Sequence, residues 1–299
     1  MKITKSGIYP DITPARYFED PCPTPSLNGS TISVLLAECP AKAAWQHPAI
    51  HQPKDDAARE VEKYLIGSGA GKPAQALGGV VHRMALGKGA EYVISDWEEY
   101  RTKEAKEWVK ETWASGAIPL KPKQHEQAVA MASVMTDAIN EAVRGEPYET
   151  EVVIAWQEDT PSGPIWCRGM LDLWVPSLDL ILDVKTAATI SDDAIDGTFN
   201  RYGYSRQSAY YRRGVDAITG GSSRFDFLFV ENEAPWLTRT VDTSEGFRTG
   251  ATMEIERAIA TWGKCVASGK WTGYGPRTVS PTAWKSAQWA MHELEMEEE

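Results

Sequence analysis

The sequence has 299 residues and a formal net charge of −11, with 42% hydrophobic and 24% charged residues, which is typical of a globular protein with a substantial core. No apolar run has the length of a membrane span, no signal-type segment follows Met1, and four separated cysteines form no Cys-x-x-Cys pair. We therefore expect a cytoplasmic protein without membrane contacts, zinc clip or iron–sulfur cluster. The acidic total argues mildly against a nucleic-acid partner but leaves room for a local basic groove.

The first half of the chain is predicted to be mainly helical. Residues 1–30 are rich in Pro, Asp and Thr and are expected to form an extended arm with little regular structure. Ser30 and Thr31 are expected to cap a short helix that Pro40 ends, and 48–73 is expected to be a mobile loop or a broken helix. Apolar residues at helical spacing predict further helices over about 75–87, 100–115 and 123–144. The apolar side of the last helix is expected to carry Val129, Met135, Ala138, Ile139 and Val143.

The second half is predicted to contain most of the strands. A strand at 148–156 and a turn at 160–163 lead to 165–168 and then to two strands, 169–175 and 178–186, which we interpret as a hairpin around Pro176 and Ser177. A polar segment follows, and then a helix at about 204–215, a strand pair at 224–230 and 236–241, and a helix at about 246–267. The last segment, with Trp and Pro, is expected to lie over the core. This order predicts an α/β layered domain with a mixed sheet.

Three ionisable residues interrupt the apolar hairpin: Asp172 in its first strand, and Asp183 and Lys185 near the end of its second. Residues 183 and 185 are two apart on a strand, so their side chains leave the same face of the sheet. An isolated Asp-x-Lys at a strand end is most often a salt bridge. The alternative is a hydrolytic metal site, in which the two aspartates are hard oxygen ligands for Mg²⁺ and the lysine lies beside the attacking water.

Two further residues have ordinary interpretations when each is taken alone. His82 lies near the edge of the apolar stripe of the helix at 75–87, where a single histidine is usually structural. Glu151 opens an apolar strand and is most simply an exposed edge residue.

Taken together, these residues resemble the PD-(D/E)XK nuclease superfamily, and within it the phage and prophage exonucleases of the RecE (exonuclease VIII) type. The resemblance rests on an ordered set of motifs: His82, Glu151, Gly169-Met170-Leu171-Asp172, Asp183-Val184-Lys185 and Gln207-x-x-x-Tyr211. Stretches at 7–17 and 271–284 are also similar to this branch, so nearly the whole chain is covered. Asp-x-Lys alone is a weak signal, whereas the ordered set is a strong one. Asp183 stands where many superfamily members have Glu, a substitution that this branch accepts.

The resemblance implies a restriction-endonuclease-like α/β core, with a central mixed sheet flanked by helices and a helical N-terminal part. It implies a single nuclease domain over 1–299. We divide this domain into an N-terminal arm with helices (1–73), a nuclease core (74–270) and a C-terminal segment with an acidic tail (271–299).

The resemblance also implies a metal site. Asp172 and Asp183 would hold one or two Mg²⁺ or Mn²⁺ ions together with the Val184 carbonyl, and His82 and Glu151 would be additional ligands. Such ions neutralise phosphoryl oxygens and activate water.

Other residues would act on the DNA. Lys185 would orient the nucleophilic water and offset phosphate charge. Gln207 and Tyr211 are four residues apart on a helix, so they would reach the scissile strand together. We also assign Arg168, Arg201 and Arg206 to DNA binding; for the arginines around Gln207, a solvated helix face is an equally good explanation.

The branch implies a processive 5′→3′ exonuclease that acts on ends of double-stranded DNA in a bacterial host. It would be encoded by a phage or prophage, form a homo-oligomeric ring, and leave a 3′ single strand for a RecT-like annealing protein. Two alternatives stay open. One is another PD-(D/E)XK nuclease that acts on single strands or endonucleolytically, and the other is a DNA-binding protein that has lost catalysis. The presence of Asp172, Asp183 and Lys185 argues against the second.

Overall fold

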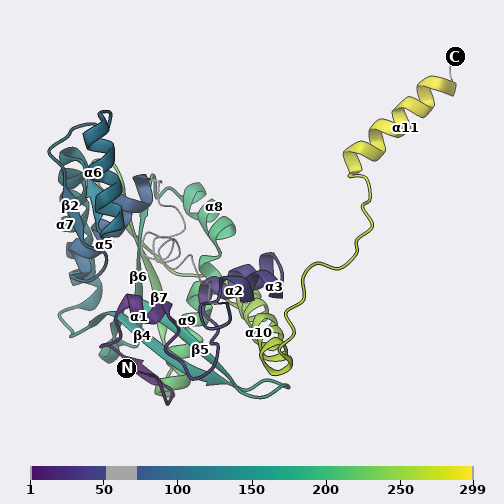
Figure 1. The fold of residues 1–299 in the computed structure, drawn as a ribbon, viewed down its shortest axis with the longest axis horizontal. Coiled ribbons are helices and arrows are strands. Elements are labelled where there is room, and N and C mark those ends of the chain that lie inside the picture. The colour runs from purple at the N-terminus through teal and green to yellow at the C-terminus, as the bar shows by residue number, and fades with distance from the viewer. Residues whose placement is uncertain (1, 52–72, 298–299) are drawn as a thin grey trace.

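The computed structural model describes residues 2–51 and 73–297 (Figure 1). Its centre is a six-stranded mixed sheet in the order β1-β4-β5-β6-β7-β8. Neighbouring strands are antiparallel except β6 and β7, which run parallel. The strands are β1 (Gly7–Tyr9), β4 (Glu149–Glu158), β5 (Ile165–Val175), β6 (Leu180–Ala187), β7 (Arg224–Glu231) and β8 (Thr238–Val241). The prediction of an α/β fold with a central mixed sheet is confirmed.

The predicted hairpin is formed by β5 and β6, which a single 3₁₀ turn, η1 (Pro176–Leu178), connects. After β6 the chain must cross over, because β7 lies parallel to it. Two helices make this connection, α8 (Asp192–Tyr202) and α9 (Tyr204–Thr219). We predicted α9 but expected only a polar segment where α8 lies. Two aspartates in the first turn of α8 and buried Ile195 and Phe199, four residues apart, explain this helix.

Helices cover both faces of the sheet. On one face, α2 (Gly29–Ala37), α9 and α10 (Glu245–Ser268) pack over a core that contains Trp156 and Trp262. On the other face, α5 (Pro73–Leu86) and α7 (Pro122–Val143) pack over Leu182 and Val184. Since side chains alternate along a strand, Asp183 points from β6 towards the α9 side.

Smaller elements complete the described chain. A second sheet consists of two parallel strands, β2 (Tyr92–Ile94) and β3 (Ile118–Leu120). The predicted helix α6 (Lys103–Ala114) connects them in the sequence. The N-terminal arm, which we expected to lack regular structure, contains β1 and α1 (Pro14–Phe18). Helix α3 (Pro40–Gln46) follows α2. The predicted loop or broken helix at 48–73 lies mostly outside the described residues.

Two details of the predicted helices are wrong. Val129 is 48% exposed, because the buried stripe of α7 runs through Ala128, Met131 and Met135, and Val129 lies about 100° away from it. Helix α2 is capped by Asn28, whose side-chain oxygen accepts a hydrogen bond from the Thr31 N–H at 2.8 Å.

The C-terminal segment lies over the core only at its beginning. Trp271 contacts Trp262 at a ring-centroid distance of 4.8 Å. The chain then leads away from the body to α11 (Ala283–Glu297), which stands apart from the sheet and its helices (Figure 1). The expectation that the whole segment covers the core is therefore wrong. Among the described helices, none combines the length and the hydropathy needed to cross a membrane.

Candidate active site

The candidate site lies where β5 and β6 separate. Their last paired residues are Leu173 and Leu182. Beyond this pair a side chain of β5, and not its backbone, bonds to β6: Asp172 Oδ2 accepts a hydrogen bond from the Val184 backbone N–H at 2.9 Å. Asp172 and Asp183 would form the next pair in this register. The hairpin therefore brings the two predicted acidic residues to the same point.

Asp183 is buried and its carboxylate is held from two sides. Gln207 Nε2 on α9 donates to Oδ2 at 2.6 Å, and the Lys185 ammonium contacts Oδ1. Lys185 Nζ also lies 5.3 Å from the centre of the Tyr204 ring, within the range of a cation–π interaction. The prediction that residues 183 and 185 share a face of the sheet is confirmed.

The charges of this cluster shift its pKa values strongly. Burial and the neighbouring Asp172 carboxylate raise the pKa of Asp183 to about 7, although Lys185 acts to lower it. Burial acts to lower the pKa of Lys185, but Asp183 and Asp172 outweigh burial and raise it. The lysine is therefore protonated at neutral pH.

His82, on α5, lies between two carboxylates. Its Nε2 is 3.3 Å from Asp172 Oδ1, and its Nδ1 is 3.5 Å from Glu151 Oε1. Burial acts to lower the pKa of His82, but the carboxylates, Asp172 above all, raise it. Burial likewise acts to raise the pKa of Asp172, but His82 and then Lys185 lower it to about 2. Asp172 therefore remains a carboxylate at neutral pH.

Glu151 is buried in β4, so its interpretation as an exposed edge residue is wrong. Only 6% of the residue is exposed, and its φ of +47° is left-handed. For a residue other than glycine this conformation costs on the order of 1–3 kcal/mol, and it is found mainly at functional sites. Burial raises the pKa of Glu151, although His82 acts to lower it. The Oε2 atom has no hydrogen-bond partner within the described residues.

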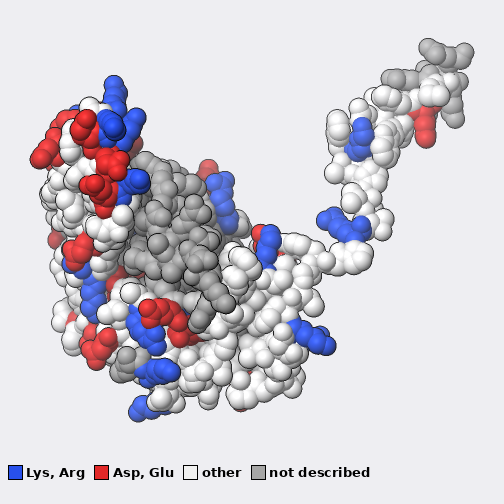
Figure 2. Space-filling view, in the orientation of Figure 1, with Lys and Arg blue, Asp and Glu red and all other residues white. Residues whose placement is uncertain are grey.

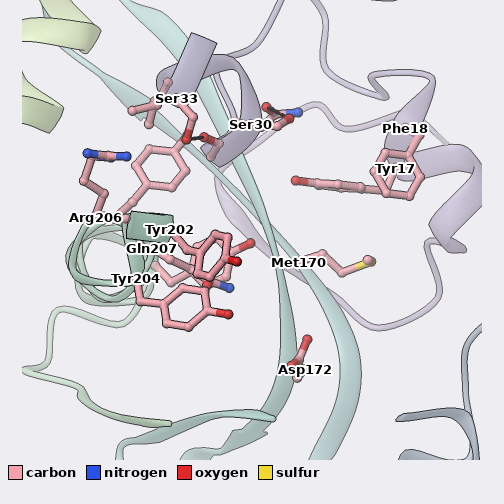
Figure 3. A pocket seen from close by; sticks show the side chains of 16 residues that line it. Tyr17, Phe18, Ser30, Ser33, Met170, Asp172, Tyr202, Tyr204, Arg206 and Gln207 are labelled. Carbon is pink, nitrogen blue, oxygen red and sulfur yellow. Dashed lines mark hydrogen bonds between the residues drawn. The ribbon is translucent and has the colours of Figure 1, made fainter. Parts of the chain in front are cut away.

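Two hollows meet at Asp172. The first, which we call the acid-lined hollow, has a volume of about 530 Å³ and is lined in part by His82, Glu151 and Lys185. The second, the aromatic hollow, has a volume of about 350 Å³ (Figure 3). Both hollows are lined by Met170, Asp172 and Tyr204. A ligand at Asp172 would therefore adjoin both of them.

The donor atoms are of the kind that a hard divalent cation binds. Buried Glu151 Oε2 and Asp183 Oδ1 have no hydrogen-bond partner among the described residues, although the second meets the Lys185 ammonium. No three acidic, histidine or cysteine side chains of the described residues form a group that could hold a metal as they stand. In the structure His82 pairs with Asp172 and Glu151, and Lys185 pairs with Asp183. A cation would replace these internal pairs.

A family model described as a PDDEXK-like domain of unknown function (DUF3799) matches residues 36–277. The chain belongs to this family. The match confirms the predicted superfamily, and with it a nuclease fold of the PD-(D/E)XK type. A search among curated proteins gives no match.

Several solved structures are similar to this PDDEXK-like chain, and two of them are exonucleases by description. One is a candidate exonuclease from Eubacterium rectale, with a TM-score of 0.49, 13% identity, and coverage of 88% of this chain and 92% of that chain. The other is a phage-related exonuclease from Haemophilus somnus 129PT, with a TM-score of 0.32, 13% identity, and coverage of 82% and 96%.

Gly169, which opens the Gly-Met-Leu-Asp motif of this PDDEXK-like domain, makes room for Tyr211. A Cβ at position 169 would lie 2.9 Å from Tyr211 Cε1 and 3.2 Å from Ile154 Cγ1. The tyrosine ring therefore packs directly on β5, beside Met170 and Asp172. Burial raises the pKa of Tyr211 well above its usual range, so the phenol stays neutral.

The three arginines assigned to DNA binding have different surroundings. Arg168 is buried; its guanidinium donates to the Tyr17 and Ser26 carbonyls and pairs with Asp20 at 3.2 Å. Its assignment to DNA binding is therefore wrong, because a phosphate cannot reach it. Arg206 lines the aromatic hollow, and Arg201 is exposed in the last turn of α8.

Tyr204 is a site residue that the sequence analysis missed. It contacts Lys185 and lines both hollows. The available signal was its position three residues before Gln207 on the same helix. On the face seen in Figure 2, Lys and Arg are interspersed with Asp and Glu, most densely over α6.

Proposed function

We propose that this chain is a metal-dependent deoxyribonuclease that removes nucleotides from the ends of double-stranded DNA in the 5′→3′ direction. The observation that carries the proposal is the cluster of buried Asp183 with the half-buried Asp172, Lys185 and Gln207, beside a hollow in a PDDEXK-like domain. Phosphodiester hydrolysis needs an aligned water and positive charge on the phosphoryl oxygens. Two carboxylates and a protonated lysine are suited to supplying both.

The cation would be Mg²⁺ or Mn²⁺, held by Asp172, Asp183 and Glu151, with His82 and the Val184 carbonyl as further ligands. When bound, it supplies charge to the phosphoryl oxygens and makes a water more acidic. Its positive charge would also lower the pKa of Asp183 and keep this residue a carboxylate.

The side chains would position the other reacting groups. Lys185 would hold the attacking water and offset the negative charge that develops on the phosphate. Tyr204 limits the positions that the Lys185 ammonium takes, and Gln207 fixes the Asp183 carboxylate by its hydrogen bond to Oδ2. Lys185 and Gln207 act on the same acid from opposite sides.

The resemblance to phage exonucleases supports the finer parts of the proposal. These parts are the 5′→3′ polarity, processivity, a homo-oligomeric ring, and a 3′ single strand that passes to a RecT-like annealing protein in a bacterial host. A nuclease that cuts single strands or internal bonds would use the same side chains, so the substrate has to be tested directly.

The test uses linear duplex labelled at the 5′ or the 3′ end, alongside closed circular duplex, in Mg²⁺ and in EDTA. We expect early release of the 5′ label, an intact circle, and no reaction in EDTA. Activity in EDTA would exclude the metal-dependent mechanism, and early release of the 3′ label would reverse the polarity. Cleavage of the circle would indicate an endonuclease, and binding without any cleavage would indicate a non-catalytic DNA-binding protein.

A further inference from the structure

The aromatic hollow has the size and the lining of a site for one planar group. Its volume of about 350 Å³ lies near the lower end of the range of roughly 300–1,000 Å³ that is usual for small-molecule sites. Six aromatic rings line it: Tyr17, Phe18, Tyr202, Tyr204, Tyr210 and Tyr211. Because it shares Met170, Asp172 and Tyr204 with the acid-lined hollow, a strand held at the candidate site would place an adjacent nucleotide here.

Tyr202 and Tyr204 lie on one wall of the aromatic hollow, opposite Tyr17 and Met170 (Figure 3). Their ring centroids are 6.0 Å apart, and the ring planes differ by 31°. Gly203 lies between them with a left-handed φ of +70°, so that α8 ends and α9 begins at a sharp turn that favours glycine.

The two rings differ in how much of their surface the core covers. Tyr204 stacks on Phe227 at a centroid distance of 5.4 Å and is a partly buried residue that packs against the core. Tyr202 is 60% exposed and offers ring surface that the core leaves uncovered. Tyr202 is therefore the ring that can stack on a ligand without disturbing the fold.

The polar groups of the aromatic hollow suit a nucleotide strand rather than a particular base. Arg206 pairs with Glu254 at 3.1 Å, and its buried Nε has no hydrogen-bond partner among the described residues. In the first turns of α2, the hydroxyls of Ser30 and Ser33 donate to Asn28 Oδ1 and the Gly29 carbonyl. Because these two hydroxyl protons are already used, the serines have no free donor for a base, whereas stacking on an aromatic ring accepts every base.

We propose that the aromatic hollow binds one unpaired nucleobase of the strand being cut, stacked on Tyr202, with Arg206 beside the adjoining phosphate. This inference rests on the proposed nuclease function and extends it. A base can enter the hollow only after its pair is broken, so at least one base pair opens before the strand is cut. We therefore expect frayed ends to be bound better than fully paired ends, with little dependence on which base is present.

The test measures binding of end-labelled duplexes in Mg²⁺ by Lys185→Ala chains, which are expected to cut very slowly. Each duplex has a mismatched end, and abasic sites replace the bases of one strand one position at a time. At one position, loss of the base should weaken binding at least about fivefold, the effect of one stacked base. Adding Tyr202→Ala should abolish the difference, and Tyr202→Phe should keep it. Tyr148→Ala, an exposed tyrosine outside the aromatic hollow, should behave like Lys185→Ala alone.

Two sets of results are decisive. The inference is wrong if no abasic position weakens binding, or if Tyr202→Ala retains the full effect, while the parent chain still digests linear duplex; the proposed function then stands. If the parent chain cuts no DNA, the proposed function fails, and the abasic series still reports whether Tyr202 binds a base.

Discussion

Replacement of Lys185 by Ala separates a catalytic role from a structural one. The Lys185 and Asp183 side chains are 19% and 2% exposed, so they do not form the exposed salt bridge that is usual for an Asp-x-Lys at a strand end. Removing one partner of a buried pair typically costs about 3–5 kcal/mol of folding free energy. The cost here should be smaller, because the pKa of Asp183 is already raised to about 7 and the carboxyl can take up a proton.

Lys185→Ala should also slow the reaction strongly, even in chains that remain folded. Removing one preorganised group that stabilises transition-state charge costs about 10²–10³ in rate, or about 2.7–4 kcal/mol of barrier. Lys185→Ala should therefore bind DNA ends normally and cut them about 10²–10³ times more slowly. Lys185→Arg should also fail, because a planar guanidinium cannot take the place of a compact ammonium.

The assay is single-turnover cleavage of end-labelled linear duplex in Mg²⁺, with a melting curve of each variant. Lys42→Ala is the matched control, because its ammonium forms a surface pair with Glu38. This control should keep the parent rate. If Lys185→Ala is folded and cuts at close to the parent rate, the catalytic role is refuted, and Asp-x-Lys is an ordinary buried ion pair.

Three further variants test other parts of the structure. His82→Ala should weaken Mn²⁺ binding about 10–100-fold in calorimetry; a lower melting temperature with unchanged metal affinity would make His82 purely structural. Gly169→Ala should destabilise the fold by about 1–3 kcal/mol, because the new Cβ would crowd the Tyr211 ring, whereas Gly197→Ala has no atom within 4 Å and should not. Burial and Arg168 lower the pKa of His47 to about 4 from 6.5. At a pH between these two pKa values, His47 binds more protons in the unfolded chain than in the folded one. Lowering the pH from 7 to 5 should therefore reduce the free energy of unfolding by about 2 kcal/mol through this histidine. Denaturant titrations should show a flatter pH dependence for His47→Gln, and equal slopes would contradict this origin.

The sequence predicted the parts of the site that follow from local periodicity. Alternation along 178–186 placed Asp183 and Lys185 on one face, and the structure joins them in an ion pair. Helical spacing placed Gln207 and Tyr211 on one helix, and α9 brings Gln207 to Asp183. Both inferences need only the geometry of a single strand or helix.

The sequence could not predict features that depend on distant segments. Glu151 is buried because α5 brings His82 against the start of β4, and nothing near Glu151 in the sequence indicates this contact. Arg168 looks like an exposed cation in a strand, but Asp20 and Ser26 from the N-terminal arm enclose its guanidinium. In both cases the decisive partner is far away in the sequence, so no local pattern reports it.

Calorimetric titration of Mn²⁺ into the parent chain tests the central claim most directly, because it measures the metal site without relying on any DNA substrate. We expect saturable binding that is lost in Asp172→Asn and in Asp183→Asn. Binding should be retained in Asp226→Asn, a buried acid that pairs with Arg224 at 2.9 Å. A parent chain without saturable binding, or aspartate variants that bind Mn²⁺ as tightly as the parent, would contradict the account.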